Sequence, residues 1–278
     1  MKALVESGRP IHQLGEDEPI VVFKDVSIGF DGKKVLDNIS FEVDRGQTLI
    51  ILGPAGCGKS VLMKLVNGLM CPDSGTITVF GQDVTRTSEK ELFALRAHIG
   101  MVFQESALFD SLSVADNVAY RLHEDRMDEK EVHERVVEAL HFVELEQAID
   151  RFPSQLSGGM RRRVSIARAI ITGPDLILYD SPTGGLDPIT STTIIELVVK
   201  QRDVSHTTSL LITHRIQDAF AMATHRFNSE TGHMEPLPDG GVDHGTRFLV
   251  MNAGGVVYHG DTLGLVHSED PWIKDYLA

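Results

Sequence analysis

Short apolar runs closed by turn residues characterise the first part of the chain. Ile20–Ser27 (IVVFKDVS) is rich in β-branched and aromatic residues and predicts a strand. The dipeptide Asp31-Gly32 follows between two such runs, which favours a β-hairpin. Gln47–Leu52 (QTLIIL) predicts a buried strand of a mostly parallel sheet, and Gly75–Phe80 (GTITVF) predicts a further strand.

Helical signals follow this β-rich part. Ser88 and Ser113 are each followed three residues later by an acidic residue, the capping-box pattern that begins a helix. Asp128–Phe142 is strongly charged and predicts an amphipathic, exposed helix, with apolar positions at Val132, Val136, Val137 and Leu140. Another helix is expected to begin at Ser157 and to end at Gly173-Pro174.

The last part of the chain returns to strand patterns. Leu176–Tyr179 and Ser209–Ile212 predict buried strands, and Arg247–Asn252 with Val256–His259 predicts a final strand pair. Thr231–Thr246 is rich in Gly, Pro, Asp and His and predicts a long surface loop. Strands therefore bracket a helical block, which indicates an α/β core with a helical insertion.

Composition narrows the class of protein. Of 278 residues, 42% are hydrophobic and 24% charged, so the chain can bury a substantial core and is not disordered as a whole. The formal net charge of -14 disfavours a broad electrostatic interaction with nucleic acid. The two cysteines, Cys57 and Cys71, imply no disulfide framework.

The beginning of the chain bears on where the protein acts. Residues 1–19 are polar and acidic without periodicity, which predicts a flexible tail, and they lack the apolar core of a secretory signal. No apolar stretch approaches the roughly 20 residues that span a bilayer. We therefore expect a soluble, cytoplasmic protein.

The strongest local signal is a phosphate-binding loop. Residues 53–60 (GPAGCGKS) fit G-x-x-x-x-G-K-[ST], follow a predicted strand and precede an apolar helical segment (VLMKLV). Glycines let backbone N–H groups converge on phosphate oxygens, Lys59 reaches the β- and γ-phosphates, and the Ser60 hydroxyl binds Mg²⁺. A Gly-rich turn without a ligand is the alternative, but the Lys-Ser pair serves no turn geometry. The expected nucleotide contacts are Gly53, Pro54, Ala55, Gly56, Cys57, Gly58, Lys59, Ser60 and Val61.

A carboxylate at a second strand end supports the same site. Asp180 closes the predicted strand that begins at Leu176, and the metal of a bound nucleotide lies at this edge of a parallel α/β sheet. Alone, Asp180 could equally close a strand into a turn. Beside the phosphate loop it predicts a nucleotide-binding protein.

Ordered motifs carry a resemblance to a known family. Leu156–Met160 (LSGGM) resembles the LSGGQ signature of ABC-type ATPases. Phe30 resembles the aromatic residue that stacks on adenine, and Gln104 the glutamine of the Q-loop. Gly184–Asp187 resembles the D-loop, and His214 the switch histidine. The resemblance covers about residues 20–224 and is specific because the motifs occur in order.

This resemblance implies both a fold and a cofactor. The expected fold is α/β, a P-loop NTPase of the ABC ATPase type with a RecA-like core, an antiparallel β subdomain and a helical subdomain. The domain would cover 20–278, with the helical subdomain at about 105–169 and a variable loop at about 231–246. ATP and Mg²⁺ are the implied cofactors. In the family, two copies form a homodimer that holds ATP between the phosphate loop of one subunit and the signature of the other.

The resemblance also implies roles for individual residues. Nucleotide contacts beyond the phosphate loop are expected at Phe30, Ser157, Gly158, Gly159 and Asp187. Metal ligands are expected at Ser60, Gln104 and Asp180. Hydrolysis is expected to use Gln104, Asp180, Ser181 and His214. The three arginines 161–163 are interpreted as a solvated charged face, with attraction of nucleotide as the alternative.

One residue departs from the family pattern. Ser181 stands where the family has a glutamate that polarises the attacking water, and loss of a general base costs about 10²–10⁴ in rate. Slow hydrolysis positioned by His214 and Gln104 is one interpretation, and Glu105 as a substitute acid is another. The third is an ATP-gated regulatory subunit that hydrolyses little ATP. We favour genuine but slow hydrolysis.

Within the family, three segments resemble the ATPases of Mla-type, Mce-associated lipid transporters: Phe103–Tyr120, Ser157–Ile170 and Gly185–Ser191. The implied partners are an integral membrane permease and a lipid-binding substrate protein, with the chain peripheral on the cytoplasmic face of the membrane. Leu108 and Phe109 would contact the permease or, alternatively, pack locally on the Ser113 helix. An importer ATPase for another substrate is an alternative. A role in DNA repair or translation is disfavoured by the negative charge, and no nucleic-acid partner is expected.

Overall fold

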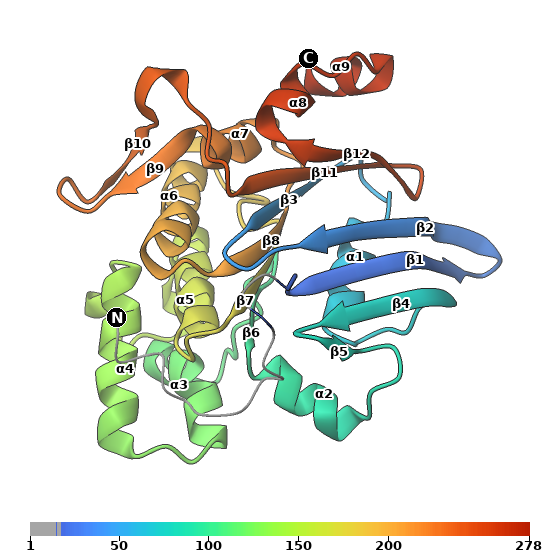
Figure 1. Ribbon diagram of the computed structural model, residues 1–278. Coiled ribbons are helices and arrows are strands. Elements are labelled where there is room, and N and C mark those ends of the chain that lie inside the picture. The colour runs from blue at the N-terminus through green and yellow to red at the C-terminus, as the bar shows by residue number, and fades with distance from the viewer. Residues whose placement is uncertain (1–14, 16–17) are drawn as a thin grey trace.

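A six-stranded sheet forms the centre of the computed structural model, which describes residue 15 and residues 18–278 (Figure 1). Its strands are β3 (Thr48–Leu52), β6 (Ile99–Val102), β7 (Leu176–Asp180), β8 (Thr208–Ile212), β11 (Thr246–Asn252) and β12 (Gly255–Asp261). They lie in the order β12-β11-β3-β8-β7-β6. All neighbours from β11 to β6 are parallel, and β12 is antiparallel to β11. The tail predicted over 1–19 lies almost entirely outside the described residues.

The central strands form where the apolar runs of the sequence predict them, with one exception. Every residue of β3 and β8 is buried, as parallel strands covered on both faces require. The strand β6 has no counterpart among the predicted elements, because four residues with a central glycine show no period. Gly100 allows close packing there, since a Cβ would lie 2.4 Å from the Ala169 carbonyl oxygen.

A second, antiparallel sheet contains β1 (Val21–Phe30), β2 (Lys33–Val43), β4 (Ser74–Val79) and β5 (Gln82–Asp83), in the order β2-β1-β4-β5. The predicted hairpin is confirmed: Asp31 and Gly32 both have positive φ, and Phe30 pairs with Lys33. Phe23 and Phe41 stack across β1 and β2 with ring centroids 4.5 Å apart.

Three helices begin where the sequence predicted a capping serine, whereas the helix that begins after Asp187 was not predicted from its cap. Their bounds are α1 Lys59–Val66, α2 Glu89–Arg96, α3 Val114–Glu124, α4 Glu129–Phe142, α5 Gly158–Ile170, α6 Pro188–Ser205, α7 Ile216–Thr224, α8 Thr262–Val266 and α9 Pro271–Leu277. Short 3₁₀ turns lie at Glu146–Ala148, Pro153–Gln155 and Pro238–Gly240. Ser88, Ser113 and Ser157 each accept a hydrogen bond from the first turn of α2, α3 and α5. Along α4 the apolar stripe is buried, but Val137 is off the stripe and exposed.

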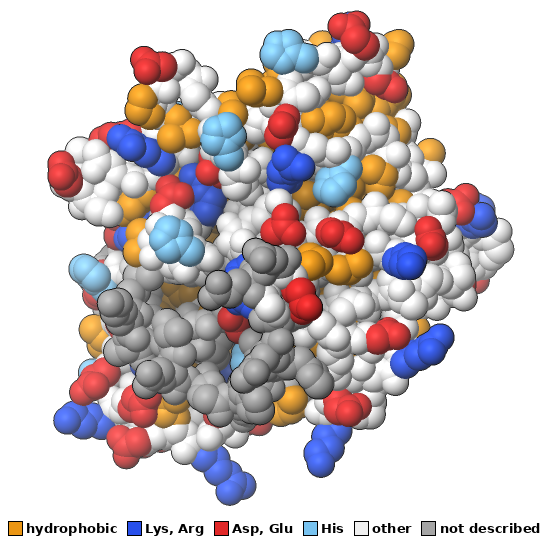
Figure 2. Space-filling view, viewed as in Figure 1, with side chains coloured by type: hydrophobic (Ala, Val, Ile, Leu, Met, Phe, Trp, Pro, Cys, Tyr) orange, Lys and Arg blue, Asp and Glu red, His pale blue; other side chains and the backbone are white. Residues whose placement is uncertain are grey.

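Two apolar layers cover the faces of the central sheet. In β3, Ile50 and Leu52 pack with the helices α3–α7, whereas Leu49 and Ile51 pack with the antiparallel sheet, α1 and α2. The alternation is the two-residue period of a strand whose faces are both covered. Figure 1 shows the same arrangement, with α3–α6 on one side and β1, β2 and β4 on the other. On the face in Figure 2, acidic and basic side chains are interspersed.

The predicted loop over 231–246 is partly regular, which corrects that expectation. β9 (His225–Asn228) and β10 (His233–Pro236) form an antiparallel pair beside α6 (Figure 1). Glu196 of α6 accepts a hydrogen bond from the Met234 N–H at 2.7 Å. Composition could not reveal this anchoring, because it depends on a residue of another element. Within the described residues, no helix is long and apolar enough to cross a membrane.

Candidate functional site

Four neighbouring strands bring motifs from distant parts of the chain to one edge of the central sheet. β3, β8, β7 and β6 are parallel neighbours, and the register pairs Ile51 with Ile212 and Ile212 with Asp180. Gly53 follows β3, His214 follows β8, Asp180 ends β7 and Gln104 follows β6. The carboxyl ends of parallel strands are where α/β proteins bind nucleotides.

The phosphate loop depends on its glycines. Gly53, Gly56 and Gly58 have φ of 146°, 78° and 102°, values that favour glycine. A Cβ on Gly58 would lie 2.5 Å from a Leu36 methyl carbon and 3.0 Å from the Val35 carbonyl oxygen. This close approach places β2 against the loop. The hairpin of β1 and β2 also carries Phe30, whose ring is 41% exposed.

The first turn of α1 offers backbone donors without a side-chain cap. The helices α2–α6 each have a Ser or Asp side chain that accepts from the first turn, whereas the N-cap of α1 is Gly58, with no side-chain cap hydrogen bond. Unpaired N–H groups and the helix dipole attract anions at such an end. The residues of this loop therefore fit a phosphate group.

Lys59 is held within the loop. Its Nζ donates to the carbonyl oxygens of Gly53 and Pro54, each at 2.8 Å, and lies 3.7 Å from the Cys57 sulfur. Its side chain is nearly buried, whereas Pro54, Ala55, Gly56 and Ser60 are exposed. The ammonium group is thus placed at the loop, and the open residues leave room for a ligand.

Tyr276 is a site residue that the sequence analysis missed. Its hydroxyl accepts a hydrogen bond from the Gly53 N–H at 3.0 Å, and its ring stacks on Trp272. Burial raises the pKa of this hydroxyl. The C-terminal helix α9 therefore supports the first residue of the phosphate loop. No local pattern reveals this contact, because the two residues are far apart in the sequence.

Ser181 is fixed by its backbone. It has a φ of +49°, its N–H donates to the Ile212 carbonyl at 3.0 Å, and its own carbonyl accepts from Gly184 at 2.9 Å. The residue is 7% exposed. The position at which the sequence resemblance leads us to expect a general base therefore holds a buried serine on a tightly turned loop. The exposed side chain of Gln104 lies beside this loop, since a Cβ on Gly184 would be 3.3 Å from its Cγ.

A buried acidic residue supports the same loop and was also missed. Asp218 of α7 is 5% exposed and accepts a hydrogen bond from the Thr183 hydroxyl at 2.5 Å. The Arg215 guanidinium lies 3.2 Å from the same carboxylate. Arg215 follows His214 directly, so this cluster ties the loop of Ser181 to the segment of His214.

The signature residues form a second group. Ser157 accepts from the Met160 N–H at 3.2 Å as the N-cap of α5. A Cβ on Gly159 would lie 2.5 Å from a Thr190 methyl, so the signature packs on the beginning of α6. Asp187 caps α6, and hydrogen bonds from Thr190 lower the pKa of its carboxyl. Gly158 and Gly159 thus contact the segment that follows the Ser181 loop.

The interpretation of residues 161–163 as a solvated face is wrong for Arg162. This side chain is 3% exposed and donates to the carbonyls of Phe103, Gln104 and Gly184. A sequence signal exists, because Arg162 shares a helix face with the apolar residues Ile166, Ala169 and Ile170, which lie four, seven and eight residues later and are buried.

Exposed aromatic residues surround a groove beside Gln104. The rings of Phe109 and Tyr120 are in contact in a tilted arrangement, with centroids 4.7 Å apart and an interplanar angle of 35°, and the residues are 43% and 42% exposed. They line a cavity of about 340 Å³ together with Phe103, Arg121 and Arg168. Asn117 also bonds both backbone groups of Phe109. Phe109 is therefore held locally by α3, the helix that begins after Ser113, and its ring is also exposed to a possible partner.

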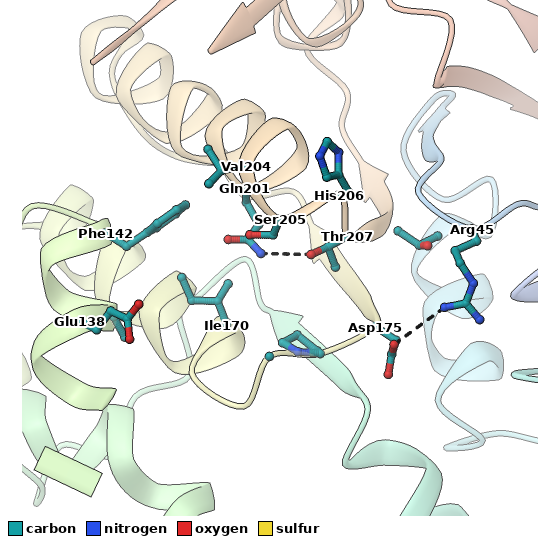
Figure 3. Close-up of a pocket in the computed structure, with 14 residues that line it drawn as sticks. Arg45, Glu138, Phe142, Ile170, Asp175, Gln201, Val204, Ser205, His206 and Thr207 are labelled. Carbon is teal, nitrogen blue, oxygen red and sulfur yellow. Dashed lines mark hydrogen bonds and ion pairs between the residues drawn. The ribbon is translucent and has the colours of Figure 1, made fainter. Parts of the chain in front are cut away.

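A cavity of about 410 Å³ lies elsewhere (Figure 3). It is lined by Pro174, Asp175 and Thr207, which precede β7 and β8, so it lies at the sheet edge opposite to the phosphate loop. Within the described residues, no group of three or more His, Cys, Asp or Glu side chains could hold a metal ion.

Comparisons with known proteins agree with this geometry. The ABC transporter family model matches residues 36–184. The chain is 36% identical over 263 residues to the methionine import ATP-binding protein MetN of Bifidobacterium longum, covering 94% of this chain and 60% of that protein. It is 35% identical over 212 residues to the intermembrane phospholipid transport system ATP-binding protein MlaF of Haemophilus influenzae, covering 76% and 80%. It is 44% identical over 181 residues to a MetN of Bacillus thuringiensis, covering 65% of this chain but only 53% of that protein.

Solved structures share the fold. The ATP-binding cassette MJ0796, in a dimeric post-hydrolysis state with ADP and Pi, has a TM-score of 0.73 and 28% identity, covering 87% of this chain and 98% of that chain. CbiO1 of Clostridium perfringens, part of the transporter complex cbiONQ, has a TM-score of 0.76 and 28% identity, covering 94% of each. These likenesses confirm the expected fold class.

Proposed function

The chain belongs to the ABC transporter family, and from this premise we propose that it is the ATP-hydrolysing subunit of a membrane transporter. One observation carries the proposal: the N-terminus of α1, which has no side-chain cap, lies with Lys59 at one edge of the central sheet. Asp180 ends β7 at the same edge, and Gln104 and His214 follow the ends of the neighbouring strands β6 and β8. Backbone donors and an ammonium group bind phosphates, and carboxylate and hydroxyl oxygens bind Mg²⁺.

Each residue then has a defined task. The N–H groups at the beginning of α1 and Lys59 bind the phosphates, and Phe30 stacks on the base. Ser60, Asp180 and Gln104 supply oxygen ligands for Mg²⁺, which neutralises charge that develops on the phosphates. His214 and Gln104 position the attacking water, with the Ser181 hydroxyl as a weak orienting group in place of a carboxylate.

A second copy of the chain completes the site in this proposal. Ser157, Gly158 and Gly159 lie at the beginning of α5 and Asp187 at the beginning of α6, and they would bind the nucleotide held by a partner's phosphate loop. The dimeric state of the cassette MJ0796 supports this arrangement. The chain would act at the cytoplasmic face of a membrane.

The aromatic groove would receive a membrane permease. Phe93, Phe103, Phe109 and Tyr120 are each more than a third exposed and lie near Arg96, Arg121 and Arg168. Exposed aromatic rings beside arginines are typical of the centre of a protein–protein interface. A permease segment with apolar and acidic side chains fits this chemistry.

Phospholipid is the substrate that we propose, because the segments 103–120, 157–170 and 185–191 resemble lipid-transporter ATPases. The MlaF relative supports this choice, whereas the MetN relatives favour a methionine importer as the second candidate. The complex purified with its permease can be reconstituted into phospholipid vesicles, with a methionine-binding protein or a lipid-binding protein added. Stimulation of ATP turnover by the lipid system supports the first candidate, and stimulation by the methionine system replaces it with the second.

The proposal that the chain hydrolyses ATP is tested by measuring Mg-ATP turnover in that complex for wild type, Lys59→Ala and Ser181→Glu. We expect measurable turnover that Lys59→Ala abolishes and Ser181→Glu raises by about 10²–10⁴. Glu105→Gln tests the substitute acid: unchanged turnover excludes that role. No turnover in wild type, with activity in Ser181→Glu, would establish an ATP-gated regulator instead.

A further inference from the structure

Two arginines of α5 hold the segment that follows β6. Arg162 donates to the carbonyls of Phe103 and Gln104. Arg168 donates to the carbonyls of Ser106 at 2.9 Å and Ala107 at 2.7 Å. Four carbonyls of residues 103–107 are therefore bound from one helix, on which the two arginines lie less than two turns apart.

The same Arg162 side chain reaches a second functional loop. Its Nη2 lies 3.3 Å from the Gly184 carbonyl oxygen, in the loop that Ser181 begins. The Gln104 side chain packs on the same glycine. One guanidinium group therefore connects the Gln104 segment, the Ser181–Gly184 loop and the signature helix.

The burial of Arg162 is costly for a purely structural residue. It is 3% exposed, its hydrogen bonds all go to neutral carbonyls, and among the described residues its buried Nε has no hydrogen-bond partner. An apolar side chain of similar length would fill such a site at lower cost in desolvation. The planar fork of arginine, in contrast, can bind several carbonyls at fixed angles.

The bound segment is also strained. Ser106 and Ala107 have φ of +62° and +47°, and consecutive left-handed residues other than glycine are uncommon. Their carbonyls are the two that Arg168 holds. The segment lies between Gln104 and Phe109, so it connects the site edge to the aromatic groove.

We propose that Arg162 and Arg168 attach residues 103–107 firmly to α5, and that Arg162 is a positioning residue for ATP hydrolysis. The role in hydrolysis rests on the proposed function, but the attachment itself does not.

Arg163→Met provides a matched control for Arg162→Met. Arg163 is the next residue on α5 and donates to the carbonyls of Val143 and Glu144, within the helical region. Both variants remove one guanidinium from the same helix. Arg162→Lys is the conservative variant, because one ammonium can bind the Gln104 segment or Gly184 but cannot hold all three carbonyls with arginine's geometry.

Hydrogen exchange of the full chain tests the attachment without hydrolysis. We expect Arg162→Met to accelerate exchange at residues 103–107 and 184–186 together, by about 10-fold or more, and Arg163→Met to leave both segments unchanged. Arg162→Lys should restore protection in part. Unchanged exchange in a folded Arg162→Met, or acceleration at only one segment, overturns the attachment. If Arg162→Met does not fold, the same criterion applies to Arg162→Lys.

Mg-ATP kinetics test the positioning role. Arg162→Met should lower kcat by about 10- to 100-fold with KM within about twofold, since the reacting groups are misplaced while the phosphate loop is intact. Arg163→Met should retain wild-type kcat. Equal loss of kcat in both variants, or a rise in KM alone, overturns the positioning role. If wild type does not hydrolyse ATP, the proposed function fails, while the exchange result still decides the attachment.

Discussion

The N-termini of α1 and α5 differ in the group that caps them, a backbone carbonyl in α1 and a serine hydroxyl in α5. The first turn of α1 has Gly58 as its N-cap and no side-chain acceptor. The first turn of α5 is capped by Ser157, whose hydroxyl accepts from Met160. The Val61 N–H of α1 donates instead to the Gly58 carbonyl oxygen at 3.0 Å, so backbone alone closes the α1 end, with Gly58 in a left-handed conformation that favours glycine.

This difference concerns which group each end depends on. The Ser157 hydroxyl can accept from Met160 and still donate its own hydrogen to a phosphate, so neither end has to rearrange to bind an anion. A phosphate at the α1 end would depend on the backbone of Gly58, and a phosphate at the α5 end on the Ser157 hydroxyl. Three substitutions test this contrast.

The largest expected effect is at the α1 end. Gly58→Ala places an alanine at a φ of +102° and brings its Cβ within 2.5 Å of Leu36. We expect the free energy of ATP binding to become less favourable by about 3 kcal/mol, which is roughly 100-fold weaker binding. Gly56→Ala is the control, because its φ is +78° but nothing lies within 4 Å of the added carbon. Only about 1–2 kcal/mol of backbone strain is expected there. Titration calorimetry with Mg-ATP measures both, and equal losses would contradict the steric argument.

A smaller effect is expected at the α5 end. Ser157→Ala removes a cap worth about 1 kcal/mol of stability, and we expect turnover to fall about 10-fold while ATP binding to the monomer is unchanged. Ser113→Ala removes an equivalent cap from α3, which has no expected nucleotide contact. Both should lower the melting temperature similarly, but Ser113→Ala should keep wild-type turnover. Parallel loss of turnover in the two variants would mean that Ser157 is only a cap.

The smallest effect concerns Asp187, which caps the helix packed on the signature. Hydrogen bonds from Thr190 lower the pKa of its carboxyl, so this capping contribution is present above the ordinary Asp pKa and is lost as pH falls through the lowered value. Thr190→Val should therefore raise the Asp187 pKa toward its ordinary value. Thr193→Val, on the same helix but bonded to Ile189, is the control. An NMR titration measures the pKa of Asp187 in each variant. A change of this pKa in both variants, or in neither, contradicts the assigned role of Thr190.

Local patterns in the sequence predicted the elements that carry the site. The loop 53–60, the strand ending at Asp180 and the cap Ser157 occur where expected, because turn glycines, buried apolar runs and capping serines act within a few residues. Elements without a local signal were missed. β6 is too short to show a period, and β10 is regular because β9 and Glu196 bind it.

The sequence by itself determined the family, the phosphate loop and the absence of a glutamate at Ser181, since these depend on residue types in fixed order. Only the tertiary structure decided which of three consecutive arginines is buried, that Tyr276 supports Gly53, and that Asp218 joins Thr183 to Arg215. These contacts arise between elements distant in the chain. Their formation depends on sheet order and helix rotation, which global packing fixes and no local window of sequence contains.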